Sequence, residues 1–141
     1  MALSRRSFVA GSAASLVTAI ACSPASAAGA GSQPHLRAAP ATARLLGDNR
    51  PQTAIWGYNG TSPGPTLRVR KGEKLQVALE NALPQPTTVH WHGVRIDNAM
   101  DGVPDVTQAA IAPGETFNYE FTAPDAGTYW YHSHNRSWEQ V

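Results

Sequence analysis

Cysteine is almost absent from this sequence. The single cysteine among 141 residues is Cys22, and it lies in an N-terminal segment that has the pattern of an export leader. A chain cleaved after that leader would contain no cysteine, so a structural disulfide is excluded. A blue-copper electron-transfer site needs a Cys thiolate beside two His ligands, and it is excluded from the same part of the chain.

An excess of charge of either sign is also lacking, because 11 basic residues face 10 acidic ones. Nucleic acid and anionic membranes are therefore not expected as partners. Long hydrophobic runs are absent, and the apolar stretch from Val9 to Ala21 is too short and too weakly apolar to span a membrane. The length suits one domain. Frequent Pro and Gly, with no long helix-forming run after residue 30, favour an all-β domain.

Residues 1–27 have the pattern of an export signal. Arg5 and Arg6 lie in a stretch that resembles the twin-arginine motif, and Ala25-Ser26-Ala27 fits the small-residue cleavage pattern. The expected location is the periplasm or the medium. Two alternatives stay open: an ordinary secretory leader, and a lipoprotein site in which Cys22 is acylated. Residues 28–35 are expected to form a flexible lead-in, with His35 in solvent.

Alternation of apolar and polar residues predicts a series of short strands. Leu75, Val77 and Leu79 are expected to point inward, as are the aromatic residues of the segment 116–122. The two segments 66–70 and 74–81 are predicted to form a half-buried hairpin. The last residues, from Asn135, are expected to form a polar helical turn. The predicted strands cover residues 36–46, 53–58, 66–70, 74–81, 87–92, 116–122 and 128–134.

Two His-x-His pairs use four of the five histidines. Residues two apart on a strand point to the same face, so each pair sets two imidazoles side by side, about 6–7 Å apart at the backbone. Neutral imidazole is the commonest metal ligand among side chains. Imidazole suits Zn, Cu, Fe and Ni, so ligand type alone leaves the metal open. The other interpretation is a β-sandwich with structural histidines. The pairs are His90 with His92 and His132 with His134.

The motifs His90-Trp91-His92-Gly93 and Tyr129-Trp130-Tyr131-His132-Ser133-His134 resemble the first copper-binding domain of the multicopper oxidases, the laccase-like family. The resemblance runs from about Leu36 to the end of the chain. It implies a cupredoxin-like Greek-key β-sandwich over residues 36–141, an N-terminal domain that is incomplete at its C-terminus and lacks its closing strands. It also implies copper as the cofactor.

The resemblance also implies a role for each site residue. His90 matches the ligand of the type 2 copper. His92, His132 and His134 match ligands of the two type 3 coppers, with His92 and His132 on the same ion. Asp101 lies in an Asp-Gly-x-Pro stretch, where the family has an acid that helps deliver protons to reduced oxygen. The alternative is that Asp101 only starts a turn.

The chemistry implied by the resemblance is the oxidation of phenols or metal ions, coupled to reduction of oxygen to water. In the family, a later domain supplies the remaining copper ligands and the Cys-containing type 1 site. We therefore expect an N-terminal fragment of a periplasmic multicopper oxidase, inactive alone, whose missing ligands come from a C-terminal domain or another chain. The alternative is a stand-alone periplasmic copper carrier or buffer without oxidase activity.

Overall fold

A computed structural model describes residues 33–140 of the chain. The expected leader, Cys22 and most of the lead-in lie outside these residues. Within the described part, no helix is long and apolar enough to cross a lipid bilayer. The predicted all-β architecture is confirmed, because strands dominate and the helical elements are a single short turn each.

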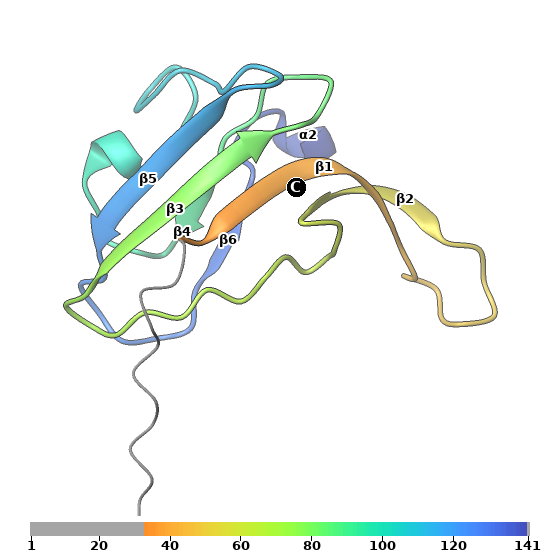
Figure 1. The fold of residues 1–141 in the computed structure, drawn as a ribbon, viewed down its shortest axis with the longest axis horizontal. Helices are drawn as coiled ribbons and strands as arrows, with labels where there is room; N and C mark the ends of the chain where they lie inside the picture. The colour runs from red at the N-terminus through yellow and green to blue at the C-terminus, as the bar shows by residue number, and fades with distance from the viewer. Residues whose placement is uncertain (1–32, 141) are drawn as a thin grey trace, which may run out of the picture. The chain divides into compact units, whose positions relative to one another are not determined.

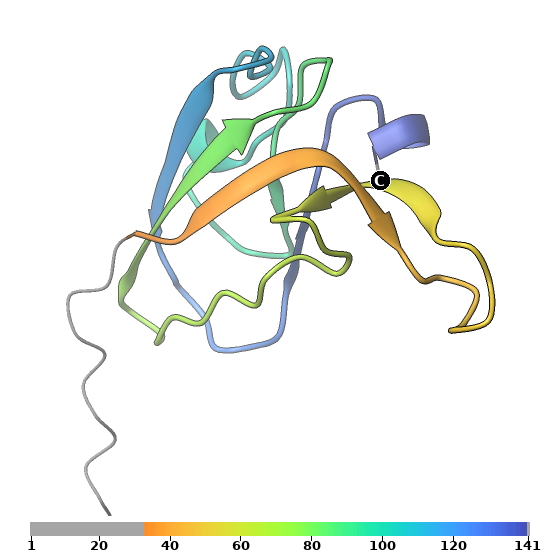
Figure 2. The same ribbon diagram turned by 45° about the vertical axis from the view of Figure 1, so that its right-hand side comes forward.

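Four strands form the larger sheet, in the order β2-β1-β3-β5 (Figure 1). β1 pairs antiparallel with β2 and parallel with β3, while β3 pairs antiparallel with β5. β1 pairs with β3 only over its first residues, up to Ala38, and then curves away with β2 (Figure 2). The strands are β1 (His35–Ala43), β2 (Thr53–Tyr58), β3 (Lys74–Asn81) and β5 (Thr116–Thr122).

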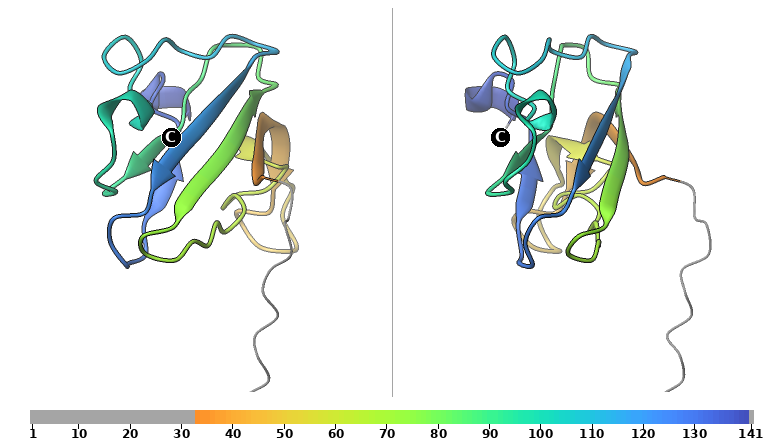
Figure 3. Two further views of the ribbon diagram at one scale, coloured as in Figure 1. Left: turned by 60° about the vertical axis from the view of Figure 1, so that its left-hand side comes forward. Right: turned by 90° about the vertical axis from the view of Figure 1, so that its left-hand side faces the viewer.

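Two short strands form a second sheet. β4 (His90–His92) and β6 (Trp130–His132) run antiparallel, and His90 lies directly opposite His132. Figure 3 shows this pair as a layer separate from β3 and β5. A single turn of 3-10 helix, η1 (Asn98–Met100), follows β4, and the short helix α2 (Ser137–Gln140) follows β6.

The core lies between the two sheets. Leu36, Val77 and Leu79 come from the larger sheet and are almost completely buried, as is Val89, which directly precedes β4. Trp91 of β4 is also buried, with its ring 5.1 Å from that of Phe121. The predicted inward residues of segments 74–81 and 116–122 all lie in or against this core, because period-two alternation assigns one face of each strand to the interior.

The predicted strand over residues 66–70 is wrong. Residues 66–70 pair with no strand: β5 pairs along one side of β3, and on its other side β1 pairs only with the second half, Ala78–Asn81. Arg68 and Arg70 are exposed as expected, and Leu67 packs against the core without joining a sheet. Two boundaries also differ: His35 belongs to β1, not to the lead-in, and β1 ends at Ala43, short of the predicted Leu46.

Candidate metal centre

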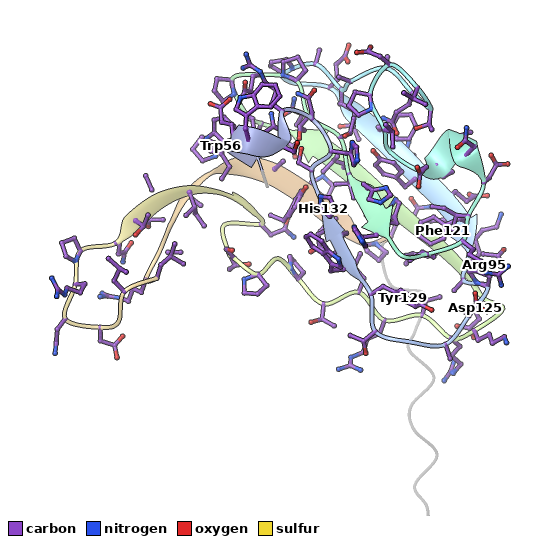
Figure 4. All side chains as sticks on the ribbon, turned by 180° about the vertical axis from the view of Figure 1, so that it is seen from behind. Trp56, Arg95, Phe121, Asp125, Tyr129 and His132 are labelled. Carbon is purple, nitrogen blue, oxygen red and sulfur yellow. The ribbon has the colours of Figure 1, made fainter. Side chains whose placement is uncertain are left out.

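The pairing of β4 with β6 brings the two His-x-His pairs together. The ligand nitrogens of His90, His92 and His132 all lie within 4.8 Å of one another. His134 lies beyond the end of β6, and its ring centroid is 5.2 Å from that of His90. All four predicted histidines therefore converge, and Figure 4 shows His132 on β6, the strand that pairs with β4. His35 lies on β1, beside Glu80 of β3.

The same alternation that gathers the imidazoles anchors their strands. Trp91 and Tyr131 are directly opposite one another and point to the other face, into the core. Trp91 packs edge-on against Tyr119, whose ring centroid is 5.5 Å away. Tyr131 donates its hydroxyl hydrogen to the carbonyl oxygen of Pro65 at 2.8 Å. His90, His92 and His132 therefore project from strands whose opposite face is fixed by aromatic packing.

An ion pair joins the segments outside the two histidine strands. Arg95 follows β4 and Asp125 precedes β6, and both Nε and Nη2 of Arg95 donate to Oδ2 of Asp125, at 3.0 and 2.8 Å. Figure 4 shows these two side chains beside Tyr129. The pair is exposed, so its contribution to stability is small. Its geometric effect is to tie the end of one short strand to the beginning of the other.

Backbone carbonyl groups fix the tautomers of two histidines. Nδ1 of His90 donates to the carbonyl oxygen of Asp101 at 2.8 Å, and Nδ1 of His132 donates to that of Ser133 at 2.7 Å. A carbonyl oxygen can only accept, so each Nδ1 carries the hydrogen and each Nε2 is unprotonated, with a lone pair that can accept a hydrogen bond or bind an ion. Such a partner on the second nitrogen is the usual arrangement around a metal-binding histidine.

The environment of His132 favours its neutral form. Burial lowers the pKa of His132, and the three neighbouring imidazoles lower it further, against the opposing effect of the hydrogen bond to Ser133. A metal binds the neutral form of imidazole. His132 is therefore kept in the state that can bind an ion at neutral pH.

Asp101, the acid to which the resemblance drew attention, lies next to His90. Its Oδ1 is 3.3 Å from Nδ1 of His90, in addition to the shorter contact made by its own carbonyl. The following residue, Gly102, has φ +78°, and a Cβ there would be 1.8 Å from the carbonyl oxygen of Val89. Only glycine permits this approach, so Gly102 brings the loop against β4 and places Asp101 beside His90.

The other two acids of the loop lie elsewhere. Asp97 caps η1 by accepting a hydrogen bond from the backbone nitrogen of Ala99 at 2.9 Å. Asp105 adopts φ 62° in a turn. Met100 packs against the core. Each of these three residues therefore has a structural role in the loop or the core.

A buried polar network behind the second pair was missed by the sequence analysis. Ser133 lies between two histidines and points inward, where its hydroxyl donates to Oε1 of Gln140 at 2.6 Å and lies 3.1 Å from Oγ1 of Thr87. Thr87 also donates to Oε1 of Gln140 at 2.8 Å. The network connects β6 to α2. Its signal in the sequence was a serine at an inward-facing position of a strand, where an apolar residue is normal.

The donor set fits a metal that prefers nitrogen ligands. Within residues 33–140 the cluster consists of imidazoles alone, since the sequence holds no thiol there and the nearby carboxylate contacts the outer nitrogen of His90. Copper and zinc both accept such a set. His90 and His132 both have an unprotonated Nε2, and His132 is held neutral, which meets the requirement that a metal-binding nitrogen carry no proton.

Comparisons with known proteins agree on one family. Residues 41–141 match the sequence profile described as multicopper oxidase. Copper resistance protein A of Pseudomonas syringae pv. tomato is 38% identical over 98% of this chain, which spans 24% of that protein. The crystal structure of Lac15 from a marine microbial metagenome matches with a TM-score of 0.74 and 52% identity, over 77% of this chain and 29% of Lac15. A multi-copper oxidase structure from Pseudomonas thermotolerans matches with a TM-score of 0.70 and 46% identity, over 74% and 25% of the two chains.

Proposed function

The chain belongs to the multicopper oxidase family, and we propose that its paired histidines form half of a copper centre at which such an enzyme reduces oxygen. The chain spans between 12% and 24% of the length of the curated relatives that it matches. The expected cupredoxin-like fold is confirmed by the likeness to oxidase structures at TM-scores of 0.70 and above. Members of the family bind copper, which agrees with the cofactor expected from the sequence.

One observation carries the proposal: β4 and β6 pair in a register that sets His90 directly opposite His132. This register gathers ligand nitrogens from two strands within bonding reach of common ions. In the proposed centre, His90 binds the type 2 copper, and His92 and His132 share a type 3 copper. His134 binds the second type 3 copper.

Bound copper would transfer electrons to oxygen and stabilise negative charge on it as a Lewis acid. The residues of this chain orient and protect the centre. Asp101 and Ser133 hold the outer nitrogens of His90 and His132 through their carbonyl groups. Trp91 keeps water from the inner side of β4, because its ring fills the core beneath the histidines.

Asp101 is proposed to move protons as well as to orient a ligand. Its Oδ1 lies 3.3 Å from Nδ1 of His90, and its side chain is partly exposed. A carboxylate in this position can take a proton from solvent and pass it toward the centre. Reduction of oxygen to water consumes protons. The carboxylate of Asp101 contacts both solvent and His90, so it is placed to supply them.

The complete enzyme is proposed to work in the periplasm, with oxygen and a reducing substrate such as a phenol or a metal ion. The leader-like pattern of residues 1–27 supports export, since a twin-arginine signal carries folded protein. The remaining copper ligands, and the Cys-containing site through which electrons enter, would come from a C-terminal domain or another chain.

The test is a copper titration of the chain and its histidine variants, with metal content measured after dialysis. His90→Ala and His132→Ala should each lower copper content, because each removes a nitrogen from the cluster. His35→Ala is the matched control and should bind as the unchanged chain does. Equal binding by all three variants would contradict the proposal.

Oxygen consumption in the presence of a phenol is then measured, to show whether the chain alone forms a complete oxidase centre or only half of one. The chain alone should bind copper without consuming oxygen, and uptake should appear only when the missing ligands are supplied. Reversible copper binding by a stable monomer, with no uptake even after reconstitution with a C-terminal domain, would instead indicate a copper carrier.

A further inference from the structure

Trp130 is the one large aromatic side chain that stacks directly on the histidine cluster, among the described residues. Its ring lies 4.0 Å from that of His132, with 24° between the ring planes. It lies 4.9 Å from the ring of His92, with 30° between the planes. Trp130 is 51% exposed, so its contact with the two imidazoles takes the place of burial in the core.

The strand register explains this double contact. Trp130 lies directly opposite His92 in the β4–β6 pair and two residues before His132 on β6. A residue two positions away along a strand and a residue directly across from it share one face of the sheet. The indole therefore covers the two histidines that we propose share one copper ion.

His92 depends on this contact more than the other two histidines of the paired strands do. Carbonyl groups hold Nδ1 of His90 and of His132. Within residues 33–140, His92 makes a single side-chain hydrogen bond, from its Nδ1 to Nε2 of His132 at 3.3 Å. That bond uses the lone pair with which His132 would bind an ion. Binding would therefore break it and leave the stacked indole as the remaining constraint on the His92 ring.

We propose that Trp130 is a positioning residue that holds His92 and His132 in the orientation that binds copper. The proposal rests on the proposed function of the histidine cluster. An aromatic face also limits the access of water to the two imidazoles on which it stacks.

The first experiment measures Cu(II) affinity in competition with a chelator, for the unchanged chain and for Trp130→Ala, Trp130→Phe and Trp138→Ala. Trp130→Ala should weaken binding about 10-fold or more, the usual effect of losing a group that orients a ligand. Trp130→Phe keeps a ring that can stack and should retain most of the affinity. Trp138, which is 82% exposed on α2, is the matched control, and its removal should change nothing.

A second readout follows the ring itself. Copper bound at His92 and His132 should quench the fluorescence of Trp130, since the indole lies 4.0 Å from one ligand ring. Trp130→Phe at saturating copper should therefore lose a large part of the quenching seen in the unchanged chain. This measurement decides the matter if Trp130→Ala fails to fold.

Two results would overturn the inference. One is equal affinity in Trp130→Ala and the unchanged chain, which would make Trp130 only an exposed contact surface. The other is equal quenching in Trp130→Phe and the unchanged chain. Both leave the proposed function intact, because the unchanged chain still binds copper. Absence of copper binding by the unchanged chain would overturn the proposed function and this inference together.

Discussion

Nδ1 of His90 is closer to the backbone carbonyl oxygen of Asp101, at 2.8 Å, than to its carboxylate, at 3.3 Å. The acid thus reaches the candidate metal centre by two routes, of which only one depends on its side chain. Orientation of His90 rests mainly on the backbone. The carboxylate is left free for a different task, such as carrying a proton.

Asp101→Asn should separate these two tasks. The carbonyl contact survives the substitution, so we expect the Nδ1–H tautomer of His90 to persist and the copper affinity to change by less than about 10-fold. NMR of the imidazole nitrogens and a copper titration measure these two quantities. In an enzyme completed by its remaining domains, oxygen uptake should fall about 100-fold, the usual effect of losing a proton-transferring group. A loss of copper as large as that in His90→Ala would show that the carboxylate, not the carbonyl, holds the ring.

Gly102→Ala should destabilise the fold far more than Gly114→Ala. Both glycines have positive φ, at +78° and +83°, so each alanine carries a backbone cost of about 1–2 kcal/mol. A Cβ at position 102 would also meet the carbonyl oxygen of Val89 at 1.8 Å, whereas at 114 nothing lies within 4 Å. We expect about 3 kcal/mol or more for Gly102→Ala, with weaker copper binding because Asp101 must move. Urea denaturation measures the difference, and equal costs would refute the close approach of the loop to β4.

Ser133→Ala should lower stability although it removes a single oxygen. Its hydroxyl donates to Gln140 and accepts from the backbone nitrogen of Asn135 at 3.2 Å, inside a buried network. Unpaired buried groups cost about 1–3 kcal/mol each. Ser62→Ala, at an exposed position, is the control and should stay within about 0.5 kcal/mol. Thermal unfolding of both variants tests this prediction. An unchanged stability in Ser133→Ala would mean that α2 is held by other contacts.

Alkaline pH should unfold the domain through Tyr119. Burial raises the pKa of Tyr119 to about 12, from 10.0. The folded state therefore disfavours the phenolate, so this stability is complete below pH 10 and is lost as the pH rises toward 12. The free energy of unfolding measured from pH 9 to 12 should fall, and the fall should be shallower in Tyr119→Phe. Ionisation of Tyr119 near pH 10 with the fold intact, seen by phenolate absorbance, would contradict this.

The alternation of apolar and polar residues correctly predicted which side chains of a single strand share a face. The inward positions Leu75, Val77 and Leu79 followed from period two, as did the common face of His90 and His92. The histidine strands were predicted too long, and they pair over three residues each. Backbone pairing stops where the chain bends toward its loops, and side-chain type does not encode that point.

Pairing between distant segments could not be predicted. Residues 66–70 alternate as well as any strand, yet they join no sheet, and β3 pairs instead with β1 and β5, which lie farther away in the sequence. The parallel match of Leu36 with Leu79 joins residues far apart in the chain, and many registers satisfy the same pattern. The hydrogen bond from His90 to the carbonyl oxygen of Asp101 could not be predicted either. Every residue has a backbone carbonyl group, so residue type does not show which carbonyl a histidine will contact.

Trp91 and Tyr131 give the histidine spacing a consequence for evolution and for design. Each aromatic residue occupies the position between or beside histidines and points into the core. Inserting one residue between Trp91 and His92 would leave the indole in the core and turn the second imidazole into the interior. Replacing a single histidine on these strands removes a ligand but leaves the core face of the strand unchanged. The spacing of the histidines cannot change in the same way. The imidazoles of β4 face the metal site while Trp91 between them faces the core, so a change in spacing disturbs both.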